Sequence, residues 1–204
     1  MTTVLKVGGA LGRDGDGLRA LCTAIGEAAA RHPLLVVPGG GRFADAVRDE
    51  DERFGLAATT HHRMAILAMD QFGLMLADLV PGAGVCEDLE SAAALMRDHR
   101  AAILLPSKLA LAAADLPASW DVTSDSIAAW VAGRARARRV VLLKANPGAT
   151  GVDAHFATAL GAARVEGWIV GGDDPARLVE LLDTGATAGI RVSAPRSGLA
   201  PLSQ

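Results

Sequence analysis

Lys6 and two glycine runs are the residues of this sequence whose types and spacing indicate chemistry. Lys6 lies near the end of an apolar run, residues 3–7, and two glycines follow it directly. A second apolar run, residues 34–38, ends in three consecutive glycines. Because glycine has no Cβ, an anionic oxygen can approach the main-chain N–H groups of such turns closely. The sequence therefore predicts a phosphate site in which the Lys6 ammonium lies beside two sets of N–H groups.

The elements around these residues predict an α/β fold. A helical pattern separates the two apolar runs, so the order strand, glycine turn, helix, strand, glycine turn brings both turns to one edge of a parallel sheet. Further strands are predicted at 101–105, 139–143, 168–170 and 187–192, and helices at 42–53, 59–79, 89–98 and 125–136. Strands that alternate with helices indicate a mainly parallel sheet covered on both faces. We expect residues 1–204 to form one domain.

Composition excludes several classes of protein. The net charge of −3 provides no strong field for nucleic acid or an anionic membrane, and the seven aromatic residues include no tyrosine for base stacking. The sequence shows no signal peptide and no apolar run of membrane-spanning length, so a cytoplasmic protein is expected. Cys22 and Cys86 lie in apolar contexts that predict buried thiols, not a disulfide or a metal pair.

Two common nucleotide-binding motifs fit the glycine runs less well. The sequence contains no G-x-x-x-x-G-K-[ST] P-loop, but residues 39–44 fit the loose dinucleotide pattern G-x-G-x-x-A. That pattern also requires a strand that ends in an acidic residue about twenty positions later, where this sequence begins a long helix. A dinucleotide-dependent oxidoreductase is therefore a less favoured alternative.

Four sequence blocks resemble the amino acid kinase family, which includes acetylglutamate, aspartate, glutamate and uridylate kinases. They are Lys6-Val7-Gly8-Gly9, Val36-Val37-Pro38-Gly39-Gly40-Gly41, Trp120-Asp121-Val122-Thr123-Ser124-Asp125-Ser126-Ile127-Ala128 and Val140-Val141-Leu142-Leu143-Lys144. Residues 171–178 extend the resemblance over most of the chain. It implies a three-layer αβα sandwich and transfer of the γ-phosphoryl group of ATP to a carboxylate or phosphate, with ATP and Mg²⁺ as cofactors.

The resemblance also implies roles for individual residues. Lys6 would neutralise the transferring phosphoryl group, and Asp125 would orient the active-site lysine and the magnesium of Mg-ATP; alternatively, Asp125 is only a helix-cap carboxylate. The phosphate and substrate contacts would be Gly8, Gly9, Gly39, Gly40, Gly41, Asp45, His62, Asp121, Thr123 and Ser124. His61 and His62 are expected to be exposed polar tips or substrate contacts. No residue is assigned as a protein ligand of a metal.

The nucleotide loop departs from the family pattern. The family has Thr-Asp-Val-Asp-Gly-(Val/Ile)-Tyr and then Gly-Gly-Met with a second lysine, whereas residues 144–153 read KANPGATGVD and no such lysine motif follows before Gly171. The predicted nucleotide contacts are Lys144, Asn146 and Gly148. Lys144 either replaces the missing cation, or nucleotide binding is weakened.

Residues 62–73 and 120–125 are similar to a small archaeal and methylotroph branch of the family. That branch includes the kinase of aminomethylfuran-methyl phosphate, which makes a diphosphate in methanofuran synthesis. A small-molecule phosphate acceptor is therefore expected. A uridylate or isopentenyl phosphate kinase, or a catalytically weakened protein that binds nucleotide or oxyanions, remains an alternative. The broadly apolar helix at 64–79 predicts a homo-oligomer, at least a dimer.

Overall fold

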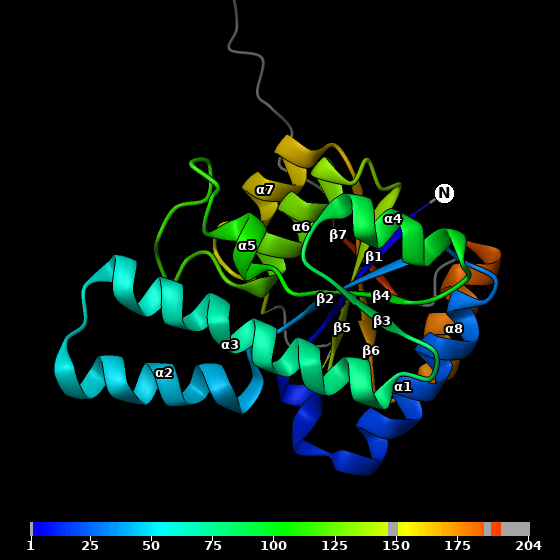
Figure 1. Ribbon diagram of the computed structural model, residues 1–204, viewed down its shortest axis with the longest axis horizontal. Helices are drawn as coiled ribbons and strands as arrows, with labels where there is room; N and C mark the ends of the chain where they lie inside the picture. The colour runs from blue at the N-terminus through cyan, green and yellow to red at the C-terminus, as the bar shows by residue number, and fades with distance from the viewer. Residues whose placement is uncertain (1, 147–150, 186–188, 193–204) are drawn as a thin grey trace, which may run out of the picture.

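A seven-stranded sheet forms the centre of the computed structural model, which describes residues 2–146, 151–185 and 189–192 (Figure 1). Its strand order is β3-β4-β2-β1-β5-β6-β7, and all neighbours are parallel except β6 and β7. The strands are β1 (Thr3–Val7), β2 (Leu34–Pro38), β3 (Gly84–Cys86), β4 (Ala102–Leu104), β5 (Arg139–Lys144), β6 (Glu166–Gly171) and β7 (Ile190–Val192).

Helices connect the strands and cover both faces of the sheet (Figure 1). They are α1 (Gly15–Ala29), α2 (Gly41–Phe54), α3 (Ala58–Leu79), α4 (Leu89–Arg97), α5 (Ser107–Ala110), α6 (Ser124–Arg134), α7 (Phe156–Ala163) and α8 (Pro175–Thr184), with a 3₁₀ turn, η1 (Gly9–Arg13), after β1. The expected three-layer αβα sandwich is thereby confirmed.

Successive side chains of β1 belong to two hydrophobic clusters, one on each face of the sheet. Val4 packs in a cluster with α6 and α7, whereas Leu5 and Val7 pack in a second cluster with α1 and α8. Successive side chains of a strand point to opposite faces, so Lys6 lies on the face that α6 covers. Apolar burial on both faces explains why β1, β2 and β5 read as continuous hydrophobic runs.

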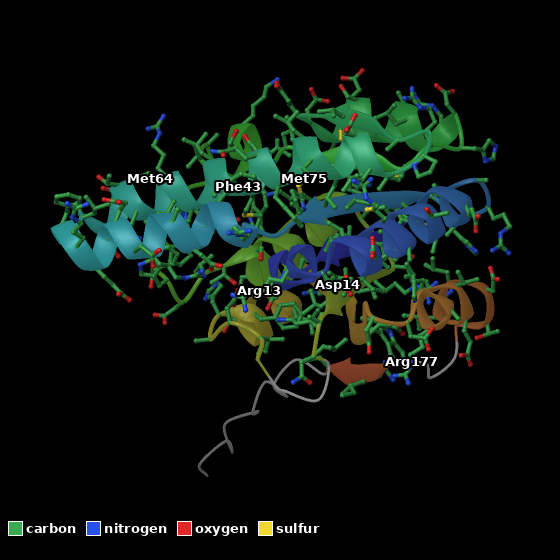
Figure 2. The ribbon with its side chains drawn as sticks, turned by 90° about the horizontal axis from the view of Figure 1, so that it is seen from below. Arg13, Asp14, Phe43, Met64, Met75 and Arg177 are labelled. Atoms are coloured by element: carbon green, nitrogen blue, oxygen red, sulfur yellow. The ribbon has the colours of Figure 1, made fainter. Side chains whose placement is uncertain are left out.

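The α2–α3 pair extends beyond the sheet (Figure 1). Figure 2 shows Phe43, Met64 and Met75 along these two helices. Leu67 and Leu74 of α3 are 43% and 54% exposed, which is unusual for two leucines on one helix. This apolar surface agrees with the homo-oligomer expected from the sequence, which stays a prediction.

Most predicted elements are present, and the differences concern short ones. The elements β3, η1 and α7 carry no clear sequence pattern, and they are only three, five and eight residues long. The last predicted strand begins outside the described residues, and its described part, β7, is antiparallel. Both cysteines are free and buried as expected, and burial raises the pKa of Cys22 to about 11 and the pKa of Cys86 to about 12. None of the helices in the described ranges combines the length and apolar character needed to cross a membrane.

Candidate active site

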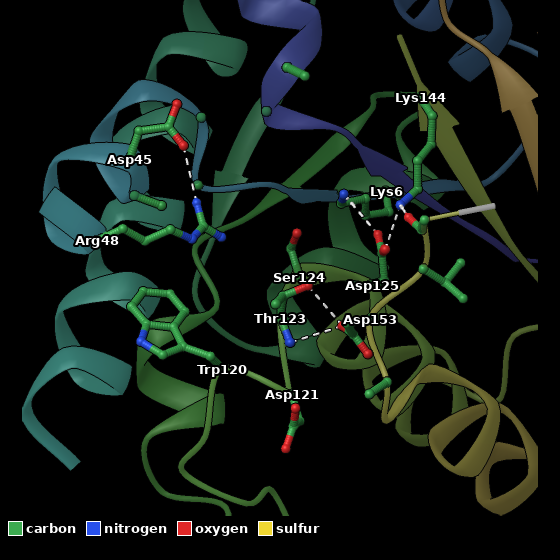
Figure 3. Close-up of a pocket in the computed structure, with 18 of the residues that line it drawn as sticks. Lys6, Asp45, Arg48, Trp120, Asp121, Thr123, Ser124, Asp125, Lys144 and Asp153 are labelled. Carbon is green, nitrogen blue, oxygen red and sulfur yellow. Dashed lines mark hydrogen bonds and ion pairs between the residues drawn. The ribbon is translucent and has the colours of Figure 1, made fainter. Parts of the chain in front are cut away.

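A cavity of about 470 Å³ lies where β1, β2 and β5 end and α2 and α6 begin (Figure 3). The residues that line it come from the ends of β1 and β5, the two glycine turns, α2, the start of α6 with the segment before it, and the segment after β5. They are Lys6, Gly9, Ala10, Arg13, Gly40, Gly41, Ala44, Asp45, Arg48, Trp120, Asp121, Thr123, Ser124, Asp125, Lys144, Gly151, Val152, Asp153 and Ala154. Most of the predicted site residues therefore meet in one place, at the carboxyl ends of the parallel strands.

Two lysines converge on one carboxylate at the floor of this cavity (Figure 3). Lys6 Nζ lies 2.8 Å from Asp125 Oδ1, and Lys144 Nζ donates to Asp125 Oδ2 at 2.6 Å. Lys6 pairs with Leu142 in the parallel register, so Lys144 lies two residues further along the same face of the sheet. The first turn of α6 supplies Asp125 from directly above that face. Lys144 therefore brings a second ammonium group to the same carboxylate.

Burial and charge shift the pKa values of these groups in physically distinct ways. Burial lowers the pKa of Lys6, and the attraction of Asp125 only partly compensates. Burial alone would raise the pKa of Asp125, but Lys6 and Lys144 outweigh it and hold that pKa below its ordinary value. When all three groups are ionised, the cluster carries one excess positive charge. Such a cluster suits an anionic ligand.

The two glycine turns touch each other beside the lysines. A Cβ on Gly9 would overlap the main-chain N and Cα of Gly41, whose φ of +56° is a left-handed conformation. Gly9, Gly40 and Gly41 line the cavity, as predicted. The N–H of Gly8 instead donates to Leu143 O and that of Gly39 to Val7 O, so these two groups hold the turns onto the sheet. The phosphate contact expected for Gly8 and Gly39 stays a prediction, but their N–H groups already have protein acceptors.

Replacing Gly9 by alanine is expected to lower the free energy of unfolding by about 1–3 kcal/mol, because the new methyl group forces the two turns apart. Chemical or thermal unfolding measures this loss of stability. Gly15→Ala is the matched control, since a Cβ there meets nothing within 4 Å. Equal stability of the two variants would contradict the tight packing of the turns.

A carboxylate from the segment after β5 caps the helix that carries Asp125. Asp153 Oδ2 accepts hydrogen bonds from Thr123 N at 2.9 Å, Ser126 N at 3.0 Å and the Thr123 hydroxyl at 2.8 Å. The Ser126 hydroxyl contacts Asp153 Oδ1. Thr123, predicted as a substrate contact, occupies the N-cap position of α6, but its hydroxyl makes no cap bond and donates to Asp153 instead. Ser124 and the exposed Asp121 line the cavity.

The wall toward α2 and α3 is built around Trp120. The Trp120 indole Nε1 donates to Asp51 Oδ2 at 2.9 Å, and its ring stacks on His61 with centroids 4.8 Å apart. The guanidinium of Arg48 lies 4.9 Å from the Trp120 ring and 3.1 Å from Asp45 Oδ1. Arg48 therefore has a fixed place at the cavity (Figure 3). Its i,i+3 spacing from Asp45 is the only signal in the sequence that could have indicated it.

His61 and His62 are buried, so the expectation of exposed tips is wrong. Trp120 covers His61. His62 lines a smaller hollow next to the main cavity together with Ile66 and Met69 of α3. Burial, and then the neighbouring His61, lower the pKa of His62 and favour its neutral imidazole. Trp120 lines the same hollow as His62.

A second cavity of about 410 Å³ adjoins the first and shares Ala10 and Arg13 with it. Leu11, Asp14, Gly17, Ala145, Gly172 and Asp173 complete its lining. Of the predicted nucleotide contacts, Lys144 lies in the main cavity, Asn146 is exposed and lines neither cavity, and Gly148 lies outside the described residues.

Comparison with known proteins gives a family match and a named relative. Residues 1–149 match the model of the amino acid kinase family. The [5-(aminomethyl)furan-3-yl]methyl phosphate kinase of Methanocaldococcus jannaschii is 28% identical over 88% of this chain and 92% of that protein.

Solved structures of uridylate kinases share the fold. The enzyme from Archaeoglobus fulgidus has a TM-score of 0.71 at 16% identity, over 93% of this chain and 98% of that one. The UMP kinase of Ureaplasma parvum has a TM-score of 0.72 at 16% identity, over 95% and 99% of the two chains.

Proposed function

This chain belongs to the amino acid kinase family, and we propose that it transfers the γ-phosphoryl group of ATP to a small phosphate ester, making a diphosphate. Aminomethylfuran-methyl phosphate is the first candidate acceptor. The observation that carries the proposal is the Lys6–Asp125–Lys144 cluster, in which two ammonium groups share one buried carboxylate at the floor of an open cavity.

Phosphoryl transfer requires alignment and positive charge more than covalent participation by the protein. An acceptor phosphate oxygen attacks the γ-phosphorus, and the bond from that phosphorus to the β–γ bridging oxygen breaks, so ADP leaves. The acceptor is already anionic and needs no general base. Lys6 and Lys144 neutralise the oxygens of the transferring group, and Asp125 holds both ammonium groups in place. The N–H groups of the turn glycines that line the cavity align the phosphates.

The two adjoining cavities offer separate places for donor and acceptor. We assign the nucleoside of ATP to the cavity beside Leu11 and Ala145, and the acceptor to the side of Trp120 and Arg48. The triphosphate would then cross at Ala10 and Arg13, next to Lys6. In this assignment each cavity holds one of the two substrates.

Magnesium fits this site as a companion of the nucleotide. Among the residues that the structure describes, no three His, Cys, Asp or Glu side chains cluster as a metal site. Both oxygens of Asp125 are engaged by lysines. Mg²⁺ commonly takes most of its ligands from phosphates and water, with one or two carboxylates, and its contribution here is to neutralise phosphate charge. The exposed Asp121 is a carboxylate at the cavity that could approach it.

The acceptor proposal rests on the named relative and on the basic wall of the cavity. The relative from M. jannaschii is named as a kinase of a phosphate ester that carries an aminomethylfuran. Arg48 places a guanidinium group on the acceptor side of the cavity, where an arginine can bind phosphate through two parallel hydrogen bonds.

The direct test of the proposal is release of ADP from Mg-ATP with a panel of acceptors. The panel holds aminomethylfuran-methyl phosphate, the corresponding alcohol, UMP, isopentenyl phosphate and acetylglutamate. We expect turnover with the first and none with its alcohol. Faster turnover with UMP or isopentenyl phosphate would reassign the acceptor, and no turnover with any of them would refute the proposal.

Replacing Arg48 by alanine is expected to raise KM for the phosphate acceptor by roughly 10- to 100-fold, because it removes one charged hydrogen bond to the phosphate. KM for ATP should stay unchanged, because Arg48 lies on the acceptor side. Steady-state kinetics measure both constants. Arg42→Ala is the matched control, since Arg42 lies on the same helix, is exposed and lines neither cavity. An equal change in KM for the acceptor in the two variants would show that Arg48 does not bind the acceptor.

A further inference from the structure

The most extensive cap in the described structure joins two parts of the chain that are far apart in sequence. Asp153 follows the segment after β5, and its carboxylate receives the N–H groups of Thr123 and Ser126 at the start of α6. The hydroxyl groups of the same two residues also contact it, and Ser126 is fully buried. Asp125 lies between the two residues that Asp153 holds. Asp153 therefore holds the helix turn from which Asp125 projects.

The free N–H groups at a helix N-terminus usually attract an anionic ligand. Here a protein carboxylate already occupies that position, so a substrate phosphate has no access to the N–H groups of Thr123 and Ser126 while Asp153 stays in place. The N–H groups of Thr123 and Ser126 thus hold Asp153 and are not free to bind phosphate. This function differs from the substrate contact that the sequence suggested for Thr123.

A second connection joins the same two parts of the chain. Lys144 donates to Asp125 Oδ2 and also to the carbonyl oxygen of Gly151, two residues before Asp153. The segment that contains Gly151 and Asp153 is therefore attached to α6 directly through Asp153 and indirectly through Lys144. Figure 3 shows Asp153 beside Thr123 at the start of α6 and the Lys144 ammonium beside Asp125.

We propose that Asp153 is a positioning residue of the phosphoryl-transfer site, which holds Asp125, and through it Lys6 and Lys144, in the geometry that reaction requires. The inference rests on the proposed function. It assigns a role to the segment in which this chain departs from the usual nucleotide loop of the family. In the part of that segment that the structure describes, Asp153 holds the start of α6 and the carbonyl oxygen of Gly151 accepts from Lys144.

An ordinary helix cap would stabilise α6 without affecting catalysis, and a matched cap separates the two roles. Asp88 caps α4 by accepting from Ser91 N at 2.8 Å, and it lines neither the main cavity nor the adjoining one. Removal of either cap should lower the thermal unfolding temperature, and removal of Asp153 should lower it more because Asp153 accepts more hydrogen bonds. Only the removal of Asp153 should change kcat.

The kinetic test compares Asp153→Ala and Asp153→Asn with Asp88→Ala, using full-length protein, Mg-ATP and the acceptor that the panel identifies. We expect kcat of Asp153→Ala to fall on the order of 10- to 100-fold, as is typical when a catalytic group is displaced by about an ångström. KM for both substrates should change little. The amide of Asp153→Asn retains a carbonyl oxygen for the N–H groups, so this conservative variant should recover part of kcat. A kcat of Asp153→Ala equal to that of Asp88→Ala would overturn the inference.

The titration of Lys6 provides a readout that does not need turnover. Burial lowers the pKa of Lys6 most and Lys144 lowers it further, whereas Asp125 and Asp153 raise it. Loss of the Asp153 charge, and of the Asp125 contact that it maintains, should therefore lower the pKa of Lys6 further. The ¹³Cε signal of Lys6, assigned with Lys6→Met, measures this pKa in the folded variants.

If the wild type turns over no acceptor, the proposed function fails while the Lys6 titration still decides the inference about Asp153. A Lys6 pKa in Asp153→Asn equal to that in the wild type and in Asp88→Ala would overturn the inference. If Asp153→Ala does not fold, Asp153→Asn supplies both readouts.

Discussion

Replacing Lys6 by methionine is expected to lower kcat by roughly 100- to 1,000-fold, which is the usual cost of removing one preorganised charge from a transition state. Methionine keeps the length and apolar character of the side chain, so the buried position stays filled. The Lys6 ammonium lies 2.8 Å from Asp125 and borders the cavity between the proposed donor and acceptor sides. Rapid-quench measurement of a single turnover separates this effect on chemistry from product release.

Arginine at position 6 supplies the control for charge. Burial lowers the pKa of Lys6 below the 10.5 of a free lysine, so the active ammonium form should be lost at a lower pH than in an exposed lysine. Lys6→Arg keeps a positive charge to higher pH. The wild-type rate should therefore fall on the alkaline side, whereas the residual rate of Lys6→Arg should not. A kcat of Lys6→Met close to that of the wild type would exclude Lys6 from catalysis.

Replacing Asp125 by asparagine is expected to cost about 3–5 kcal/mol of folding free energy, because it leaves two cations without their partner in a buried site. The side chain of Asp125 is 4% exposed, and those of Lys6 and Lys144 are 7% and 16% exposed. The same change removes the group that aligns both ammonium groups, so kcat should fall together with stability. Chemical denaturation and steady-state kinetics measure the two effects.

A double variant tests whether the cluster acts as a unit. Lys6→Met combined with Asp125→Asn removes one charge of each sign, so the double variant should be more stable than the sum of the single effects implies. Asp115→Asn breaks the exposed Asp115–Arg134 pair and should change stability little. Additive losses in the double variant would show that Lys6 and Asp125 do not interact as the structure indicates.

The glycine turns and Lys6 could be predicted from sequence because their signals are local. A strand that ends in glycines before a helix indicates a βα turn by itself, and two such turns in a parallel sheet must reach the same edge. Asp125 followed from the resemblance to the family, and its position in the first turn of α6 agrees with the predicted helix start. The site residues that these short-range patterns position are the ones that lie together in the structure.

Contacts between distant segments could not be predicted in the same way. Asp153 caps a helix that begins about thirty residues earlier, and no spacing rule connects a carboxylate in a glycine-rich loop with that helix. The burial of His61 depends on Trp120, which reaches it from a different segment of the chain. The strand β3 has only three residues and is recognisable as a strand only through its pairing with β4. In each case tertiary packing decides the outcome.

Phosphorus NMR of the wild-type protein with Mg-ATP and aminomethylfuran-methyl phosphate tests the central claim most directly. The account predicts that the γ-phosphate signal of ATP is lost while the signals of ADP and of a new diphosphate ester appear, and that Lys6→Met makes neither. ATP that stays intact beside unchanged acceptor, or that gives only inorganic phosphate, would contradict it.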